Sequence, residues 1–149
     1  MTTVIAPICK VLSLSCTPER AFEVFTSELA TWWPLETHGA FKADAASVVF
    51  EPKLGGRIVE TSVDGRENVW SVVSVWEPPK RVVFSWAPDA DKSVQTEVEI
   101  GFAPDGDGGT RFELIHRGWE RWAEQAEALR TGYDNGWNGV LAAFEGAAR

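Results

Sequence analysis

The sequence ends in RWAEQAEALRTGYDNGWNGVLAAFEGAAR, residues 121–149, whose apolar spacing predicts one long helix. At about 100° per residue, three surfaces separate around this helix. A broad apolar face carries Trp122, Ala126, Leu129, Tyr133, Trp137, Val140, Leu141 and Phe144. A polar face carries Glu124, Glu127, Asp134, Asn138 and Glu145. The pattern indicates a helix that covers another layer of structure.

The third surface is a narrow strip with almost no side chains, formed by Ala128, Gly132, Gly136, Gly139, Ala143 and Ala147. Each Gly inside a helix costs about 1 kcal/mol relative to Ala, so the strip needs a compensating gain. Close approach of another backbone segment would supply that gain, and so would room for a ligand. A helix broken near Gly132 into two shorter helices is the alternative.

The composition indicates one globular domain that spans residues 1–149. Apolar residues make up 44% of the chain, which is enough to form a core. The net charge of −8 argues against nucleic-acid binding, which needs a basic surface. No apolar run approaches the roughly 20 residues that a membrane span requires. The N-terminus also lacks a signal-peptide pattern, so we expect a cytoplasmic protein without a nucleic-acid or membrane partner.

The first part of the chain predicts a strand followed by two short helices. Residues 8–15 alternate as a strand does, and Thr17 and Pro18 suit the N-cap and the first position of a helix. We expect Ser27 to cap a second short helix, which ends before Pro34 because the residue before Pro resists helical geometry. Residues 34–46 show no clear period and predict a loop.

Six strand-like runs follow at short spacing, at residues 47–51, 56–62, 67–76, 82–86, 94–102 and 110–117. Turn residues such as Asp64-Gly65 connect them, which favours an antiparallel meander. The runs alternate so that one face of the sheet is apolar and needs a cover. Only the C-terminal helix has an apolar face of sufficient length. We therefore predict an α+β fold in which a curved antiparallel sheet of six to seven strands wraps around the long C-terminal helix.

Several motifs in this order are similar to those of the START-like or SRPBCC superfamily. They are TPERAF at 17–22, WWPL at 32–35, FEP at 50–52 with Gly55-Gly56, WEPPKR at 76–81, VFSW at 83–86, HRGW at 116–119 and Gly136-Trp137. Within that superfamily the chain resembles the branch named for activators of the ninety-kilodalton heat-shock protein's ATPase. The resemblance implies the helix-grip fold. The superfamily includes lipid and hormone carriers, polyketide cyclases and aromatases, dioxygenase subunits and co-chaperone domains. The resemblance therefore does not by itself select one activity.

The resemblance also implies a ligand cavity between the long helix and the concave face of the sheet. Strand alternation and the helix projection select the residues expected to line it: Trp33, His38, Phe84, Trp86, Phe112, Leu114, His116, Tyr133, Trp137 and Leu141. Such sites are mostly apolar with a few placed polar groups. The alternative is that these aromatic side chains simply fill the core.

The candidates for proton transfer are few. His116 shares a strand face with Phe112 and Leu114, so it is either a general base or a buried neutral imidazole bonded to a neighbour. His38 lies in the expected loop, where it either contributes to the site or faces water. Tyr133 is a further candidate, and Glu60 is one if its strand turns it inward. These residues form no recognisable catalytic constellation.

Metal and cofactor motifs are missing from the sequence. Two His and two distant Cys offer no cluster of three zinc ligands. Gly55-Gly56 lacks the third glycine of a dinucleotide fingerprint, and neither a phosphate loop nor a Gly-x-Ser-x-Gly elbow occurs. We therefore expect no metal, no cofactor and no covalent catalysis.

Three functions follow from these observations. The first is a binding protein for a small apolar or aromatic molecule, without catalysis. The second is an enzyme of the cyclase, aromatase or hydrolase type that uses general acid–base residues in the cavity. The third is a co-chaperone partner, although better-known chaperone activators carry an additional amino-terminal domain and this chain starts at the first strand. The sequence leaves open whether the protein is a monomer or a homodimer.

Overall fold

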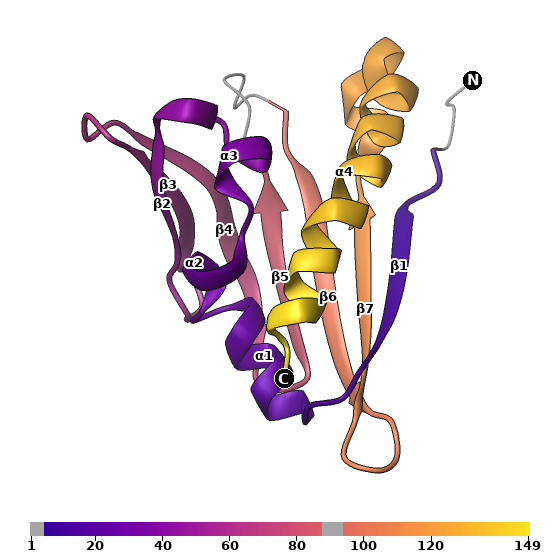
Figure 1. Cartoon of the computed structure of the whole chain (residues 1–149). Helices are drawn as coiled ribbons and strands as arrows, with labels where there is room; N and C mark the ends of the chain where they lie inside the picture. Colours follow the sequence, from indigo (N-terminus) through magenta and orange to yellow (C-terminus); the bar gives the residue numbers. More distant parts are fainter. Residues whose placement is uncertain (1–4, 88–93) are drawn as a thin grey trace.

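The computed structural model describes residues 5–87 and 94–149 and consists of a curved antiparallel sheet with helices on one face (Figure 1). Within these ranges seven strands form the sheet: β1 (Ile8–Leu14), β2 (Ala45–Phe50), β3 (Arg57–Ser62), β4 (Glu67–Glu77), β5 (Arg81–Trp86), β6 (Thr96–Pro104) and β7 (Thr110–Arg117). Their order is β1-β7-β6-β5-β4-β3-β2. Strands β2 to β7 therefore lie side by side in chain order, and β1 pairs with β7. The predicted fold class is confirmed.

The register of the sheet places one row of buried side chains across four strands. Phe84 on β5 pairs with Val98 on β6, which pairs with His116 on β7, and Ile8 on β1 completes the row. All four are almost completely buried. Alternation along each strand therefore turns this row toward the helices, as the sequence predicts.

Two helices follow β1. Thr17 caps α1 (Pro18–Phe25), since its Oγ1 accepts a hydrogen bond from the Arg20 backbone N–H at 3.2 Å. The second helix, α2 (Leu29–Trp32), ends before Pro34 as expected. The prediction that Ser27 caps it is wrong: Glu28 occupies the N-cap position, and no side chain makes a capping hydrogen bond there.

The loop predicted for residues 34–46 contains two more helical turns. These are α3 (Leu35–His38) and the 3₁₀ turn η1 (Lys42–Asp44). Each is a single turn, which is too short for an apolar period to appear in the sequence. His38, one of the residues predicted to line a cavity, is the last residue of α3.

The C-terminal helix α4 (Ala126–Ala147) runs without a break through Gly132, so the alternative of two shorter helices is not what forms. It starts five residues later than predicted, because residues from the 3₁₀ segment η2 (Trp119–Gln125) precede it. Ala123 has φ 50° and ψ −118°, so a kink inside η2 interrupts the helical backbone before α4 begins. No helix in the described ranges is long and apolar enough to cross a membrane.

One aromatic cluster of the core lies where α1 and α4 meet the sheet. The Phe112 and Phe144 rings are 4.9 Å apart, and Phe25 lies 5.2 Å from Phe144 and 5.8 Å from Phe112. These three rings are essentially inaccessible to solvent. Aromatic packing of this kind fills the space between helix and sheet at this level.

Candidate functional site

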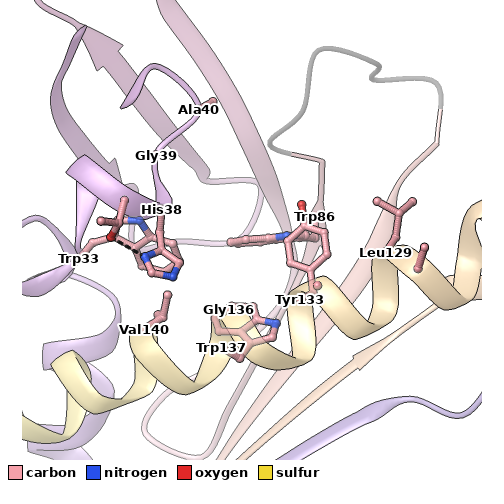
Figure 2. Close-up of a pocket in the computed structure, with 13 residues that line it drawn as sticks. Trp33, His38, Gly39, Ala40, Trp86, Leu129, Tyr133, Gly136, Trp137 and Val140 are labelled. Carbon is pink, nitrogen blue, oxygen red and sulfur yellow. Dashed lines mark hydrogen bonds between the residues drawn. The ribbon is translucent and has the colours of Figure 1, made fainter. Parts of the chain in front are cut away.

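A cavity of about 380 Å³ opens between α4 and the segment that joins α2 to η1 (Figure 2). The aromatic residues that line it are Trp33, Trp86, Tyr133 and Trp137. The other lining residues are Thr37, His38, Gly39, Ala40, Ala128, Leu129, Gly132, Gly136 and Val140. The wall is therefore mostly aromatic and aliphatic, with a few polar side chains, which is the usual composition of a small-molecule site.

The glycine strip of α4 faces this cavity and the His38 side chain (Figure 2). A Cβ atom on Gly139 would lie 3.4 Å from His38 Cε1 and 3.5 Å from Nε2, and one on Gly136 would lie 3.9 Å from Cδ2. A Cβ atom on Gly132 would meet no atom within 4 Å. The strip thus accommodates an imidazole ring at one end and leaves open space at the other.

A buried carboxylate holds the segment that follows α3. Glu60 on β3 is fully buried, and its side chain accepts hydrogen bonds from the backbone N–H groups of Ala40 at 2.7 Å and Phe41 at 3.0 Å. The indole N–H of Trp70 donates a third bond to it at 3.0 Å. Since Glu60 does not line the cavity and its oxygens already accept three N–H groups, its role is to position this segment.

Gly39 allows this segment to pass close to Glu60. A Cβ atom there would lie 2.6 Å from the Leu35 carbonyl oxygen and 2.7 Å from Glu60 Oε2. Any larger residue would push the segment away from the carboxylate. The site therefore depends on a glycine and a carboxylate that lie 21 residues apart in the chain (60 − 39).

His38 is half-buried, and its Nδ1 atom lies 2.7 Å from Thr37 Oγ1. The Thr37 hydroxyl also lies 3.3 Å from the Pro34 carbonyl oxygen, so Thr37 holds the imidazole ring against the end of α3. Cε1 and Nε2 are the ring atoms nearest to Gly139. His38 thus packs against the glycine strip of α4 and lines the cavity.

His116 is fully buried and is not among the lining residues. The Trp137 indole N–H donates to its Nδ1 at 3.0 Å, which places the imidazole proton on Nε2. Nε2–H donates to Thr96 Oγ1 at 2.7 Å, and the Thr96 hydroxyl donates to the Trp86 carbonyl oxygen at 3.3 Å. Burial lowers the pKa of His116 to about 3, so the ring is neutral at physiological pH. His116 orients Trp137 and has no access to a ligand.

Comparison with known proteins shows which family this chain belongs to. The profile of the family described as "Activator of Hsp90 ATPase homolog 1-like protein" matches residues 15–149. The chain belongs to this family. Its helix-grip fold is the one that the motifs predict. Among curated proteins, no significant match is found.

Three solved structures show what this chain is similar to. An anthrahydroquino-gamma-pyrone synthase, Txn09, complexed with SUM, shares 34% identity over 100% of both chains, with a TM-score of 0.66. The self-sacrificing resistance protein CalC from Micromonospora echinospora shares 22% identity over 96% of this chain and 94% of its own, with a TM-score of 0.75. PFC0360w, an HSP90 activator from Plasmodium falciparum, shares 18% identity over 76% of this chain and 73% of its own, with a TM-score of 0.56. The last two show the fold alone.

Of the ten residues that the sequence selects for the site, five line the cavity: Trp33, His38, Trp86, Tyr133 and Trp137. The other five are buried but lie outside the lining: Phe84, Phe112, Leu114, His116 and Leu141. Alternation indicates which side of a strand faces the helix. It does not indicate where along the helix the side chains fill the core and where they leave a cavity. Trp86 and Trp137 pack against His116, with ring centroids 6.1 and 6.0 Å from its own, and Phe112 packs against Phe144 in the aromatic cluster of the core.

Sequence reasoning missed lining residues of two kinds. Thr37, Gly39 and Ala40 belong to the unpredicted turn α3 and the residues after it. Leu129 and Val140 are on the apolar face of the predicted helix, so their spacing was a usable indication. For metals, the described part of the chain brings no three His, Cys, Asp or Glu side chains into a group able to hold an ion.

Proposed function

We propose that this protein binds a planar aromatic small molecule in the cavity between α3 and α4. The observation that carries this proposal is the wall itself: three indoles and a phenol surround about 380 Å³ beside a glycine strip. Flat rings stack favourably on indole faces, and small residues on α4 leave the width that such a ring needs. Thr37, His38 and Tyr133 supply the few polar groups that orient a ligand.

The relationship with Txn09 supports an aromatic ligand. That protein is 34% identical along its whole length and is named as an anthrahydroquino-gamma-pyrone synthase. Its name implies fused aromatic rings, which match the shape of an aromatic-walled cavity. Chaperone activation does not form part of the proposal, because the likeness to PFC0360w at 18% identity carries only the fold.

The test uses two glycines of the same helix. Gly136 lines the cavity, and a Leu side chain there leans toward the preceding turn and so covers the space beside Gly132. Gly146 lies outside the lining, and a Cβ atom on it would meet no atom within 4 Å. We expect Gly136→Leu to abolish binding of two neutral probes, 2-(hydroxymethyl)anthracene and 2-(hydroxymethyl)anthraquinone, measured by tryptophan fluorescence quenching. Gly146→Leu should bind both as wild type does. A folded Gly136→Leu protein with unchanged affinity would contradict the proposal.

A second candidate function is catalysis on the bound aromatic molecule, of the cyclase type. The specific observation in its favour is His38, a half-buried imidazole that lines the cavity and is held by a 2.7 Å hydrogen bond between its Nδ1 and Thr37 Oγ1, and we propose this ring as the general base. General bases of this kind accelerate reactions by about 10²–10⁴-fold. We expect His38→Ala to reduce turnover of any substrate found by screening by such a factor, with ligand affinity nearly unchanged. Unchanged turnover would remove His38 from this role.

A further inference from the structure

The buried tryptophans of this protein differ in how their indole N–H groups are used. In the described ranges six tryptophans are buried: Trp32, Trp33, Trp70, Trp86, Trp119 and Trp137. Four of them donate hydrogen bonds: Trp32 to Val24 O at 2.7 Å, Trp70 to Glu60 Oε1 at 3.0 Å, Trp119 to His116 O at 2.9 Å, and Trp137 to His116 Nδ1 at 3.0 Å. Trp33 and Trp86 have no acceptor among the described residues.

Both unpaired indoles line the cavity, and their ring centroids are 6.1 Å apart. A buried N–H group without an acceptor costs free energy, so such groups are rare and call for a specific explanation. Only one other buried side-chain polar atom in the described part of the chain is unpaired, Ser71 Oγ, and Ser71 does not line this cavity. Two of the three unpaired atoms thus belong to one wall of the candidate site.

We infer that the ligand carries carbonyl oxygens, as an aromatic ketone or quinone does, and that Trp33 and Trp86 donate their indole N–H groups to them. This inference rests on the proposed function and specifies the class of its ligand. Both side chains lie across the cavity from the α4 backbone (Figure 2). A ring stacked in the cavity therefore reaches this wall with the oxygens on its edge.

The charge of the lining favours a neutral acceptor over an anion. The described lining residues include neither Lys nor Arg, and the titratable groups among them are His38 and Tyr133. A carboxylate or phosphate buried here would lack a permanent cation, whereas a carbonyl oxygen needs only an N–H donor. Both indole nitrogens are covered by neighbouring atoms. Binding therefore includes a local rearrangement of the lining that exposes these two nitrogens to the ligand.

The first experiment observes the two N–H groups directly by ¹H–¹⁵N NMR of the full chain. The probes are 2-(hydroxymethyl)anthraquinone and 2-(hydroxymethyl)anthracene, two neutral molecules that share the three-ring frame and the hydroxymethyl group but differ in the two carbonyl groups. Trp→Phe variants assign the indole signals. We expect the anthraquinone probe to shift the Trp33 and Trp86 signals downfield, as hydrogen-bonded protons shift, and the anthracene probe not to do so. The Trp32 and Trp119 signals, whose donors are already bonded, serve as internal controls.

The second experiment removes the donors while keeping the ring shape. Benzothienylalanine, in which sulfur replaces the indole N–H, is incorporated at position 33 or 86, and at position 32 as the control. We expect about a two- to tenfold loss of anthraquinone affinity at 33 and 86 for each bond removed, with anthracene affinity unchanged. The control at 32 should leave both affinities unchanged.

The outcomes separate this inference from the proposed function. Equal affinity of wild type for both probes, or equal losses for both in the modified proteins, would overturn the hydrogen bonds but leave aromatic binding intact. Downfield shifts confined to Trp32 or Trp119 would also overturn them. If wild type bound neither probe, the proposed function itself would fail, and the inference would fail with it.

Discussion

Acidification should destabilise this protein through His116. The ring is fully buried among aromatic neighbours, with centroids 4.3 Å from Trp119, 5.5 Å from Tyr133 and 6.0 Å from Trp137. Its Nδ1 accepts the Trp137 N–H, so protonation at Nδ1 would break that bond as well as bury a charge. The folded protein therefore resists protonation of His116, whereas the unfolded chain does not.

The sign and size of the effect follow from the two pKa values. The folded-state pKa of His116 is about 3, and an unfolded His titrates near 6.5. Between these values the unfolded state binds more protons, so stability is complete above about pH 6.5 and falls as the pH drops toward 3. From pH 7 to pH 5 the loss is about 2 kcal/mol in the free energy of unfolding.

Urea denaturation followed by tryptophan fluorescence at pH 7, 6 and 5 measures this loss. A His116→Gln variant cannot be protonated at this position, so its stability should change about 2 kcal/mol less than that of wild type over the same range. His38→Gln retains His116 and should keep the loss. Side-chain hydrogen bonds lower the pKa of Glu28, Glu51, Asp64, Glu99 and Asp134, whose contributions disappear mainly below pH 5. Parallel profiles for wild type and His116→Gln would refute the reasoning.

Three further predictions concern the helix and the segment that form the site. Gly132→Ala and Gly146→Ala should each raise the free energy of unfolding by up to about 1 kcal/mol in urea denaturation, since both sites have open space for a Cβ atom. Only Gly132→Ala should weaken aromatic-ligand binding, because only Gly132 lines the cavity; equal ligand affinity in the two variants would contradict this. Glu60→Gln replaces an acceptor of N–H groups by a donor and should destabilise the fold by about 1–3 kcal/mol, and wild-type stability in the same assay would show that the carboxylate does not hold the segment. Ala123→Gly should stabilise by about 1 kcal/mol or more, since φ 50° and ψ −118° suit glycine; a lower melting temperature would argue against the kink.

The order of strands and helices was predictable because each element has a local period. Alternation along 110–117, for example, identifies β7 and the inward side of Phe112, Leu114 and His116. Thr17-Pro18 marks the start of α1 through a capping bond that spans three residues. Such features depend on neighbours in the chain, so the amino-acid sequence contains all the information that they need.

Part of the candidate site escaped prediction because it depends on contacts between distant residues. α3 is one turn long, and the segment after it is held by Glu60, a residue 20 positions beyond Ala40 (60 − 40). The role of His116 depends on which neighbour occupies Nδ1, and that neighbour, Trp137, is 21 residues away. No periodicity in the chain records either contact.

The sequence alone thus determined the antiparallel sheet, the long covering helix and the glycine strip along it, since strand and helix periods are properties of adjacent residues. Only the tertiary structure decided that the strip receives His38 and that His116 is a neutral buried support. It also decided that Trp33 and Trp86 lie beside a cavity with no acceptor for their indole N–H groups among the described residues. The physical reason is that burial, tautomers and unused hydrogen bonds depend on which distant side chains fill the space around a group.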